Sequence, residues 1–122
     1  MKQKVSDYIA DHIAEWGIRD VFTVTGGGAM HMNDAFGHHP KLHCTYQHHE
    51  QACAMAAEAY ARMDNRMAAV CVTTGPGATN AITGVLGGWM DSIPMLVFSG
   101  QARYATTVVA SGLKLRSMGC LL

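Results

Sequence analysis

The sequence feature that most constrains the fold is the predicted strand at 68–73, which is apolar without a break up to Thr73 and is set between two alanine- and glycine-rich stretches. A strand with one face in water would alternate apolar and polar residues, and this run does not. Continuous apolar strands are typical of parallel sheets that are covered by helices on both faces. Shorter β-rich runs at 21–24, 42–46 and 95–99 alternate with helical stretches at 29–36, 49–63 and 78–89. This alternation predicts an α/β fold, with a parallel sheet of at least four strands flanked by helices.

A further helix is predicted before the first strand. Its apolar and aromatic residues recur at helical spacing, and charged residues occupy the other face. Gly17 follows this stretch and suits a left-handed helix end. The residues at helical spacing are Val5, Tyr8, Ile9, His12, Ile13 and Trp16.

Length and charge narrow the classes of function. The 122 residues fit one domain, and 9 basic against 9 acidic side chains leave no excess positive charge for binding nucleic acid. Only 15 % of the residues are charged, against about 25 % in ordinary globular chains, which indicates apolar surface for a partner to cover. No run reaches the roughly 20 apolar residues of a membrane helix. The first segment carries acidic residues where a signal peptide would be apolar, so we expect a cytoplasmic protein.

The cysteines and histidines offer little for a metal site. Cys44, Cys53, Cys71 and Cys120 form no CxxC pair, and we expect reduced cysteines of the core. His48 and His49 are adjacent, so they cannot both face one ion from a helix. No metal ligand is therefore assigned.

Ligands of parallel α/β sheets bind beyond the carboxyl ends of the strands, which here are residues 25–28, 46–50, 74–80 and 100–101. The glycines at 26–28 do not match the dinucleotide fingerprint, because His31 stands where the third glycine is required, and no P-loop is present. A dehydrogenase-type nucleotide domain is therefore disfavoured. The glycines serve either as a tight turn or for close backbone approach to a ligand.

Three polar residues at these ends allow both a structural and a functional interpretation. Glu50 is either an exposed first-turn acid that interacts with the helix dipole or a carboxylate that points into the crevice. Thr74 and Asn80 flank the Gly-Pro-Gly turn at 75–77, which is either a connector or a ligand contact. Glu58, four residues before Arg62, has the spacing of an ordinary helical ion pair.

Several motifs occur together in the order and spacing of one family. They are His49-Glu50-Gln51, Ala56-Ala57-Glu58-Ala59-Tyr60-Ala61-Arg62, Thr74-Gly75-Pro76-Gly77-Ala78-Thr79-Asn80, Asp91-Ser92-Ile93-Pro94 and Ser99-Gly100-Gln101. Through them the chain resembles the amino-terminal pyrimidine-binding domain of thiamine-diphosphate-dependent enzymes, in the branch of the acetolactate synthase large subunit. The resemblance runs from about Val5 to Gly119.

The resemblance implies a role for individual residues. A glutamate at the position of Glu50 would hydrogen-bond the pyrimidine N1′ of thiamine diphosphate and favour its imino tautomer. The imino nitrogen then removes the thiazolium C2 proton, and the resulting ylide attacks a 2-keto acid. A site poor in water would suit that glutamate. Pro76 and Asn80 would line the pyrimidine site, and Gly26 would allow close approach of the first loop.

The resemblance also implies what this chain lacks. Relatives hold Mg²⁺ and the diphosphate on a Gly-Asp-Gly motif in a separate domain, and acetolactate synthases bind FAD in a middle domain; neither is present here. Relatives usually carry proline at the position of Thr25, and they continue into a Gln-Glu segment where this chain reads Cys120-Leu121-Leu122. We therefore expect residues 1–122 to be one pyrimidine-binding domain, incomplete at its carboxyl end and inactive alone.

Two functions follow as hypotheses. In the first, the chain is half of a thiamine-diphosphate site, completed by homodimerisation or by a diphosphate-binding domain of another chain. In the second, it is a non-catalytic truncated remnant that only self-associates. The intact Glu50 and the turn at 75–80 favour the first for its ancestry, and the missing magnesium motif favours the second for this chain alone.

Overall fold

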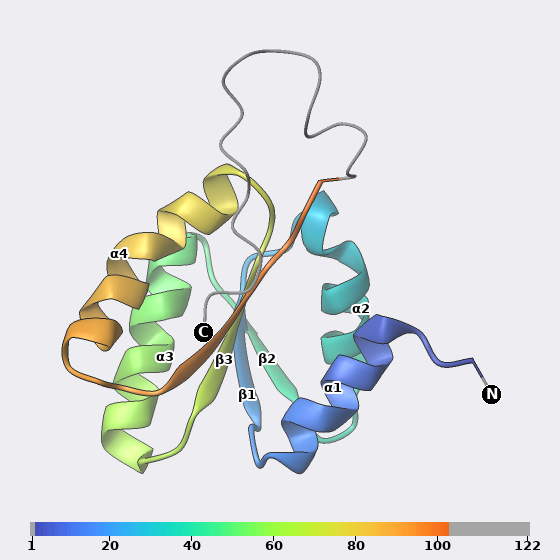
Figure 1. Cartoon of the computed structure of the whole chain (residues 1–122), viewed down its shortest axis with the longest axis horizontal. Helices are drawn as coiled ribbons and strands as arrows, with labels where there is room; N and C mark the ends of the chain where they lie inside the picture. The colour runs from blue at the N-terminus through green and yellow to red at the C-terminus, as the bar shows by residue number, and fades with distance from the viewer. Residues whose placement is uncertain (1, 103–122) are drawn as a thin grey trace.

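The computed structural model describes residues 2–102, and the expectations for residues 103–122, including Cys120, lie outside the described part (Figure 1). Within it, one sheet has the strands β1 (Asp20–Thr23), β2 (His43–Tyr46), β3 (Ala68–Val72) and β4 (Met95–Ser99). Their order is β2-β1-β3-β4, and all neighbouring strands are parallel. The predicted α/β fold is confirmed, and each strand lies within one residue of its predicted bounds.

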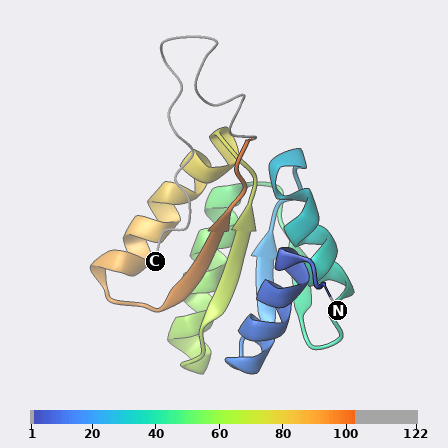
Figure 2. The same cartoon turned by 45° about the vertical axis from the view of Figure 1, so that its right-hand side comes forward.

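Helices cover both faces of this sheet (Figures 1 and 2). The helices α1 (Val5–Glu15) and α2 (Met30–His38), with the short 3₁₀ turn η1 (Gly27–Ala29), lie on one side. The helices α3 (Glu50–Asp64) and α4 (Pro76–Met90) lie on the other. Every residue of β3 is buried, which confirms the interpretation of the apolar run.

Two helices begin differently from the prediction. The stretch predicted at 29–36 opens with the 3₁₀ turn, and its α-helix passes through Gly37 to His38. The helix predicted at 78–89 starts at Pro76, because the fixed φ of proline fits the first helical position and its missing N–H has no partner to lose there. Gly75, with φ +64°, makes the turn that precedes it.

The first helix ends as predicted, with Gly17 at φ +85°, but its apolar positions are only partly the buried ones. Val5 and Trp16 are 74 % and 70 % exposed, whereas the buried residues are Ser6, Ala10, Ile13 and Ala14. Small side chains on the inner face let the helix lie close to its neighbours. Tyr8 stays outside and stacks on the His12 ring, with centroids 4.0 Å apart.

The three cysteines in the described part are free thiols, and Cys53 and Cys71 are buried. Burial raises the pKa of the Cys53 thiol to about 11, with a smaller contribution from the Glu50 carboxylate. Burial likewise raises the pKa of Cys71 to about 12. Both are therefore protonated core residues at neutral pH. None of the helices described is long and apolar enough to cross a bilayer.

Candidate functional site

The candidate site lies at the carboxyl edge of the sheet, between β1 and β3. The chain leaves β1 toward β2 on one side, and it leaves β3 toward β4 on the other. Such a divergence of connections opens a crevice outside the strand ends, where ligands of parallel α/β sheets bind. The loop that begins at Gly26 and the turn at Gly75 therefore border the same point of the sheet.

Glu50 occupies the centre of this edge as the first residue of α3. The Nδ1 atom of His49 accepts a hydrogen bond from the Gln51 N–H at 3.1 Å and so caps the helix. Glu50 is only 9 % exposed. The exposed first-turn acid considered from the sequence is therefore excluded, and the burial expected for a proton-exchanging glutamate is found.

The Glu50 carboxylate is held by the first turn of α4. Its Oε2 accepts a hydrogen bond from Asn80 Nδ2 at 2.9 Å. Its Oε1 lies against Gly77, where an added Cβ would be 3.3 Å away. Glycine at this position thus leaves room for the carboxylate, and the prediction that Glu50 and Asn80 share a site is consistent with their direct contact.

The electrostatics of Glu50 are unusual for a buried acid. Among residues 2–102 it forms no ion pair, and Asn80 is its only side-chain hydrogen-bond partner. Buried charges are costly unless they are paired or hydrogen-bonded. The first turns of α3 and α4 both meet at this carboxylate, and helix N-termini carry partial positive charge that favours an anion.

One side chain that the sequence analysis missed connects the two loops of the site. Thr73 follows β3 directly, and its Oγ1 accepts a hydrogen bond from the Gly28 N–H at 3.0 Å. A Cβ on Gly26 would lie 2.5 Å from Thr73 Cβ, and one on Gly77 would lie 2.7 Å from Thr73 Cγ2. The available signal was its place as the first polar residue after a wholly apolar strand.

The predicted residues Gly26 and Pro76 frame the same edge. Gly26 precedes η1 in extended conformation, and its missing side chain is explained by the contact with Thr73. Pro76 is exposed at the start of α4, one residue before Gly77. Gly26 therefore packs on Thr73, and Pro76 adjoins Gly77, which packs on the same side chain. Glu50 and Asn80 touch each other.

Other candidates lie away from the site. Glu58 pairs with Arg62 at 2.7 Å, as predicted, and Arg62 also pairs with Asp91. The Glu58 side chain is only 18 % exposed, however, so it is less of a surface residue than its spacing indicated. No group of three potential metal-ligating side chains occurs in the part of the chain that the structure describes.

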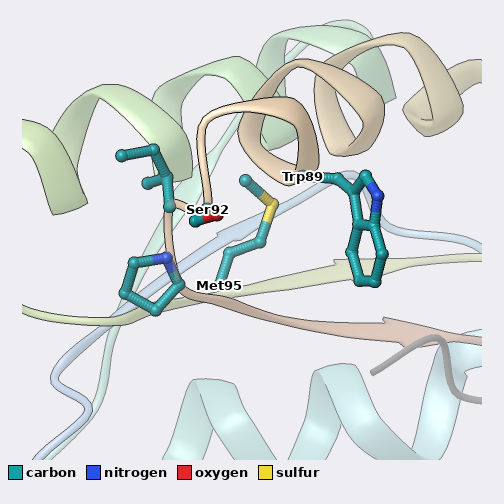
Figure 3. Close-up of a pocket in the computed structure, with 5 residues that line it drawn as sticks. Trp89, Ser92 and Met95 are labelled. Atoms are coloured by element: carbon teal, nitrogen blue, oxygen red, sulfur yellow. The ribbon is translucent and has the colours of Figure 1, made fainter.

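An open hollow of about 450 Å³ lies at the other end of the sheet (Figure 3). It is lined by Trp89, Ser92, Ile93, Pro94 and Met95, and so borders the start of β4. Glu50 and Thr73 lie at the opposite, carboxyl edge. The hollow is therefore separate from the candidate site.

The residues of the site fit the pyrimidine ring of thiamine diphosphate. Oε1 of Glu50 is the carboxylate oxygen that Asn80 does not occupy, and within residues 2–102 it accepts no hydrogen bond. It can therefore bind a protonated ring nitrogen. The described residues offer no cluster of oxygen ligands for the Mg²⁺ that accompanies a diphosphate. The fit is thus to the pyrimidine end of the cofactor.

Comparison with known proteins agrees with this geometry. Residues 3–115 match the family described as the N-terminal TPP binding domain of thiamine pyrophosphate enzymes. The acetolactate synthase large subunit of Lactococcus lactis is 36 % identical over 96 residues, which cover 79 % of this chain and 17 % of that protein. The chloroplastic acetolactate synthase 2 of Zea mays is 37 % identical over 99 residues, or 81 % of this chain and 16 % of that protein.

A third relative is isozyme 3 of the acetolactate synthase large subunit in Escherichia coli, 36 % identical over 104 residues. These cover 85 % of this chain and 18 % of that protein. The chain thus spans less than a fifth of the length of the curated relatives it matches. The family match and these relatives show that this chain belongs to the N-terminal TPP-binding domains of the thiamine pyrophosphate enzymes and is similar to acetolactate synthases.

Proposed function

We propose that this chain provides the pyrimidine half of a thiamine-diphosphate site in an acetolactate-synthase-like enzyme that acts on 2-keto acids. The observation that carries the proposal is Glu50, a 9 % exposed carboxylate held by a neutral amide at the switch point of the sheet. Thiamine diphosphate supplies, when bound, a thiazolium carbon that adds to the carbonyl of a 2-keto acid. The protein must activate and orient that cofactor.

Glu50 would exchange a proton with the pyrimidine ring through Oε1. Burial excludes water that would otherwise compete for this oxygen. Asn80 fixes the plane of the carboxyl group by donating to Oε2 at 2.9 Å, so the free oxygen has a defined direction. Gly26 and Pro76 would line the pyrimidine site and limit where the ring can lie.

The diphosphate end requires a second partner. Mg²⁺ takes near-octahedral oxygen coordination shared with phosphates, so those ligands would come from another domain or another chain. We propose a homodimer or a diphosphate-binding domain of another chain as that partner, with FAD as a further cofactor of the longer enzyme. A cytoplasmic location is part of the same proposal.

A second candidate function is a non-catalytic module that only self-associates. The observation that favours it is a set of exposed apolar side chains on α3 and α4, and large patches of this kind mark interaction surfaces. These side chains are Met55, Met63, Ile82, Leu86, Trp89 and Met90. The same surface would serve the partner of a complete enzyme.

The test is the variant Glu50→Gln in an enzyme that also contains the diphosphate-binding domain. It keeps the size of the side chain and its bond to Asn80 but removes the proton-exchanging group. We expect exchange of the C2 proton of bound cofactor to slow by about 10²–10⁴-fold, the usual contribution of a positioned acid–base group. Unchanged exchange would disprove the assignment of Glu50.

The control variant is Glu15→Gln, at the exposed end of α1. Glu58→Gln is a poorer control than its sequence position indicates, because Glu58 is partly buried and paired with Arg62. Glu15→Gln is expected to leave both exchange and folding unchanged.

Binding experiments on the isolated chain distinguish the two candidate functions. We expect calorimetric titration with thiamine diphosphate and Mg²⁺ to show weak binding at most, and no turnover of 2-keto acids. Submicromolar affinity or turnover would contradict a site that needs another domain. Complete absence of binding, together with self-association, would favour the non-catalytic module.

A further inference from the structure

The Thr73 side chain is shared by three backbone segments at the carboxyl edge of the sheet. Its hydroxyl accepts the Gly28 N–H at 3.0 Å, so it holds the turn η1. Its methyl carbon Cγ2 would lie 2.7 Å from a Cβ added to Gly77, so the methyl group contacts the first turn of α4. Its Cβ lies against Gly26, where an added Cβ would be 2.5 Å away.

The contacts of Thr73 lead directly to the Glu50 carboxylate. A Cβ built on Gly77 would lie 2.7 Å from Thr73 Cγ2 and 3.3 Å from Glu50 Oε1, so the same face of Gly77 meets both side chains. Asn80, one turn further along α4, donates to Oε2. A shift of the first turn of α4 against Thr73 would therefore move both groups that hold the carboxylate.

The neighbouring contacts leave little freedom for compensation. A Cβ on Gly28 would be 2.7 Å from Thr74 Cγ2, and one on Gly100 would be 2.4 Å from the Gly28 carbonyl oxygen. The Gly100 N–H donates a hydrogen bond to the Val72 carbonyl at 2.8 Å, and this bond fixes Gly100 against the end of β3. The glycine loop is thus packed closely between Thr73, Thr74 and Gly100.

We propose that Thr73 is a positioning residue of the site. It sets the distance between the Gly26–Gly28 loop and the Glu50–Asn80 pair without touching the pyrimidine ring itself. The hydroxyl positions the loop, and the methyl group positions the first turn of α4. This inference rests on the proposed function for its effect on ligand binding, but not for its effect on the geometry.

The experiment compares Thr73→Val, which removes the hydroxyl and keeps the branched shape, with Thr73→Ser, which keeps the hydroxyl and loses the methyl group. The control Thr83→Val makes the same change at an exposed position of α4. Nuclear magnetic resonance of the 122-residue chain reports the exchange rate of the Gly28 amide and the side-chain amide signals of Asn80. The same samples are titrated with thiamine, which carries the pyrimidine ring without a diphosphate.

We expect Thr73→Val to speed exchange at Gly28 by roughly fivefold or more, the effect of losing one ordinary hydrogen bond. It should also weaken thiamine binding by a similar factor. Thr73→Ser should keep the protection of Gly28 but shift the Asn80 amide signals, because it loses the methyl group that contacts the first turn of α4. Thr83→Val should change neither signal. If circular dichroism shows that Thr73→Val does not fold, Thr73→Ala removes the hydroxyl without an added methyl group and takes its place.

Two outcomes would overturn the inference. One is unchanged Gly28 exchange in the variant that lacks the hydroxyl, together with unchanged Asn80 signals in Thr73→Ser. The other is faster Gly28 exchange with unaltered thiamine affinity, which would reduce Thr73 to a local contact. If the parent chain does not bind thiamine, the proposed function fails for the isolated chain. The positioning role of Thr73 is then tested by the Gly28 exchange rate in Thr73→Val and by the Asn80 signals in Thr73→Ser. A change in both would support this role.

Discussion

The two faces of the sheet are filled by different kinds of side chain. Against α1 and α2, the bulky face, the buried core contains the large side chains of Phe36, Ile13 and Ile18 beside smaller ones. Against α3 and α4, the small-residue face, no buried core residue in the described part is larger than valine. This core consists of Cys53, Ala54, Ala57, Ala68, Val70, Val72, Ala81 and Val97. The first face is filled by the volume of its side chains, whereas on the second the small side chains let the helices approach each other and the sheet closely.

This difference explains why the candidate site is built from α3 and α4. Gly84 of α4 faces Ala54 of α3 so closely that a Cβ would lie 2.6 Å from the Ala54 Cβ. Helices that approach this closely bring their first turns together at the sheet edge, and the Glu50–Asn80 contact lies there. The bulky face lacks such a contact, and it supports the sheet on which the site is built.

The largest effect is expected on the bulky face. Phe36→Ala would leave a cavity beside Phe98, whose ring centroid is 5.4 Å from that of Phe36. Deleting a buried phenylalanine ring typically costs about 3–5 kcal/mol of unfolding free energy. Urea denaturation measures the change, and a loss below about 1 kcal/mol would show that this face does not depend on volume.

The small-residue face should be destabilised when one of its side chains is made larger. Gly84→Ala would place its methyl group 3.0 Å from the Met55 backbone nitrogen and 3.1 Å from the Gln51 carbonyl oxygen. Neither atom can move without the helix, so we expect a loss of about 1–3 kcal/mol in unfolding free energy.

The matched control for Gly84→Ala is Gly37→Ala in α2, where the nearest atom would be Tyr46 Oη at 3.4 Å. Without a clash, the gain in helix propensity should stabilise the chain by up to about 1 kcal/mol. Opposite signs for the two substitutions support the comparison of the faces. Equal signs would contradict it.

Alkaline pH should weaken both faces through their buried thiols. The pKa of Cys53 is raised from 9.0 to about 11, and that of Cys71 to about 12, so the folded state keeps protons that the unfolded chain releases. Stability is therefore complete below pH 9 and lost as pH rises through the folded pKa values. We expect a loss of about 1 kcal/mol for each thiol between pH 9 and 10.

The variants Cys53→Ala and Cys71→Ala separate this effect from other alkaline titrations. Each should flatten the dependence of unfolding free energy on pH above 9, measured by urea denaturation at several pH values. A slope equal to that of the parent chain would show that the thiol in question does not contribute.

The smallest effect on stability is expected on the outer surface of α4. Trp89 is 73 % exposed, so Trp89→Ser should change the unfolding free energy by no more than about 0.5 kcal/mol. If this surface binds a second copy of the chain, sedimentation should show a smaller assembly for the variant. A parent chain that is monomeric at tens of micromolar, roughly, would argue against association.

Much of the fold could be predicted because it rests on local patterns. The apolar run that became β3 and the helix end at Gly17 depend on hydrophobicity and backbone preference. The buried face of α1 was harder, because Ser6 and Ala10 are buried by how the helix packs on its neighbours rather than by their hydrophobicity.

The candidate site could likewise be predicted only where a local sequence motif marked its residues. Glu50 and Asn80 were found through their motifs, and the fold then placed them 2.9 Å apart. Thr73 was missed because two of its three contacts, with Gly26 and Gly28, are distant in sequence, and only Gly77 lies near it along the chain. Its one local signal, a polar residue directly after an apolar strand, is shared by ordinary strand ends.

The strand order has a consequence for how the chain acquires its structure during synthesis. β1 is the first strand to be made, yet it lies between β2 and β3, so both neighbours follow it in sequence. Pairing parallel strands closes long loops of the chain. The conformational entropy lost in closing them precedes the stabilising contacts between the strands, and this makes folding slow. Even when β2 has paired with it, the nascent chain therefore exposes one edge of its central strand until β3 emerges, and exposed strand edges of this kind are where aggregation and chaperone binding are expected.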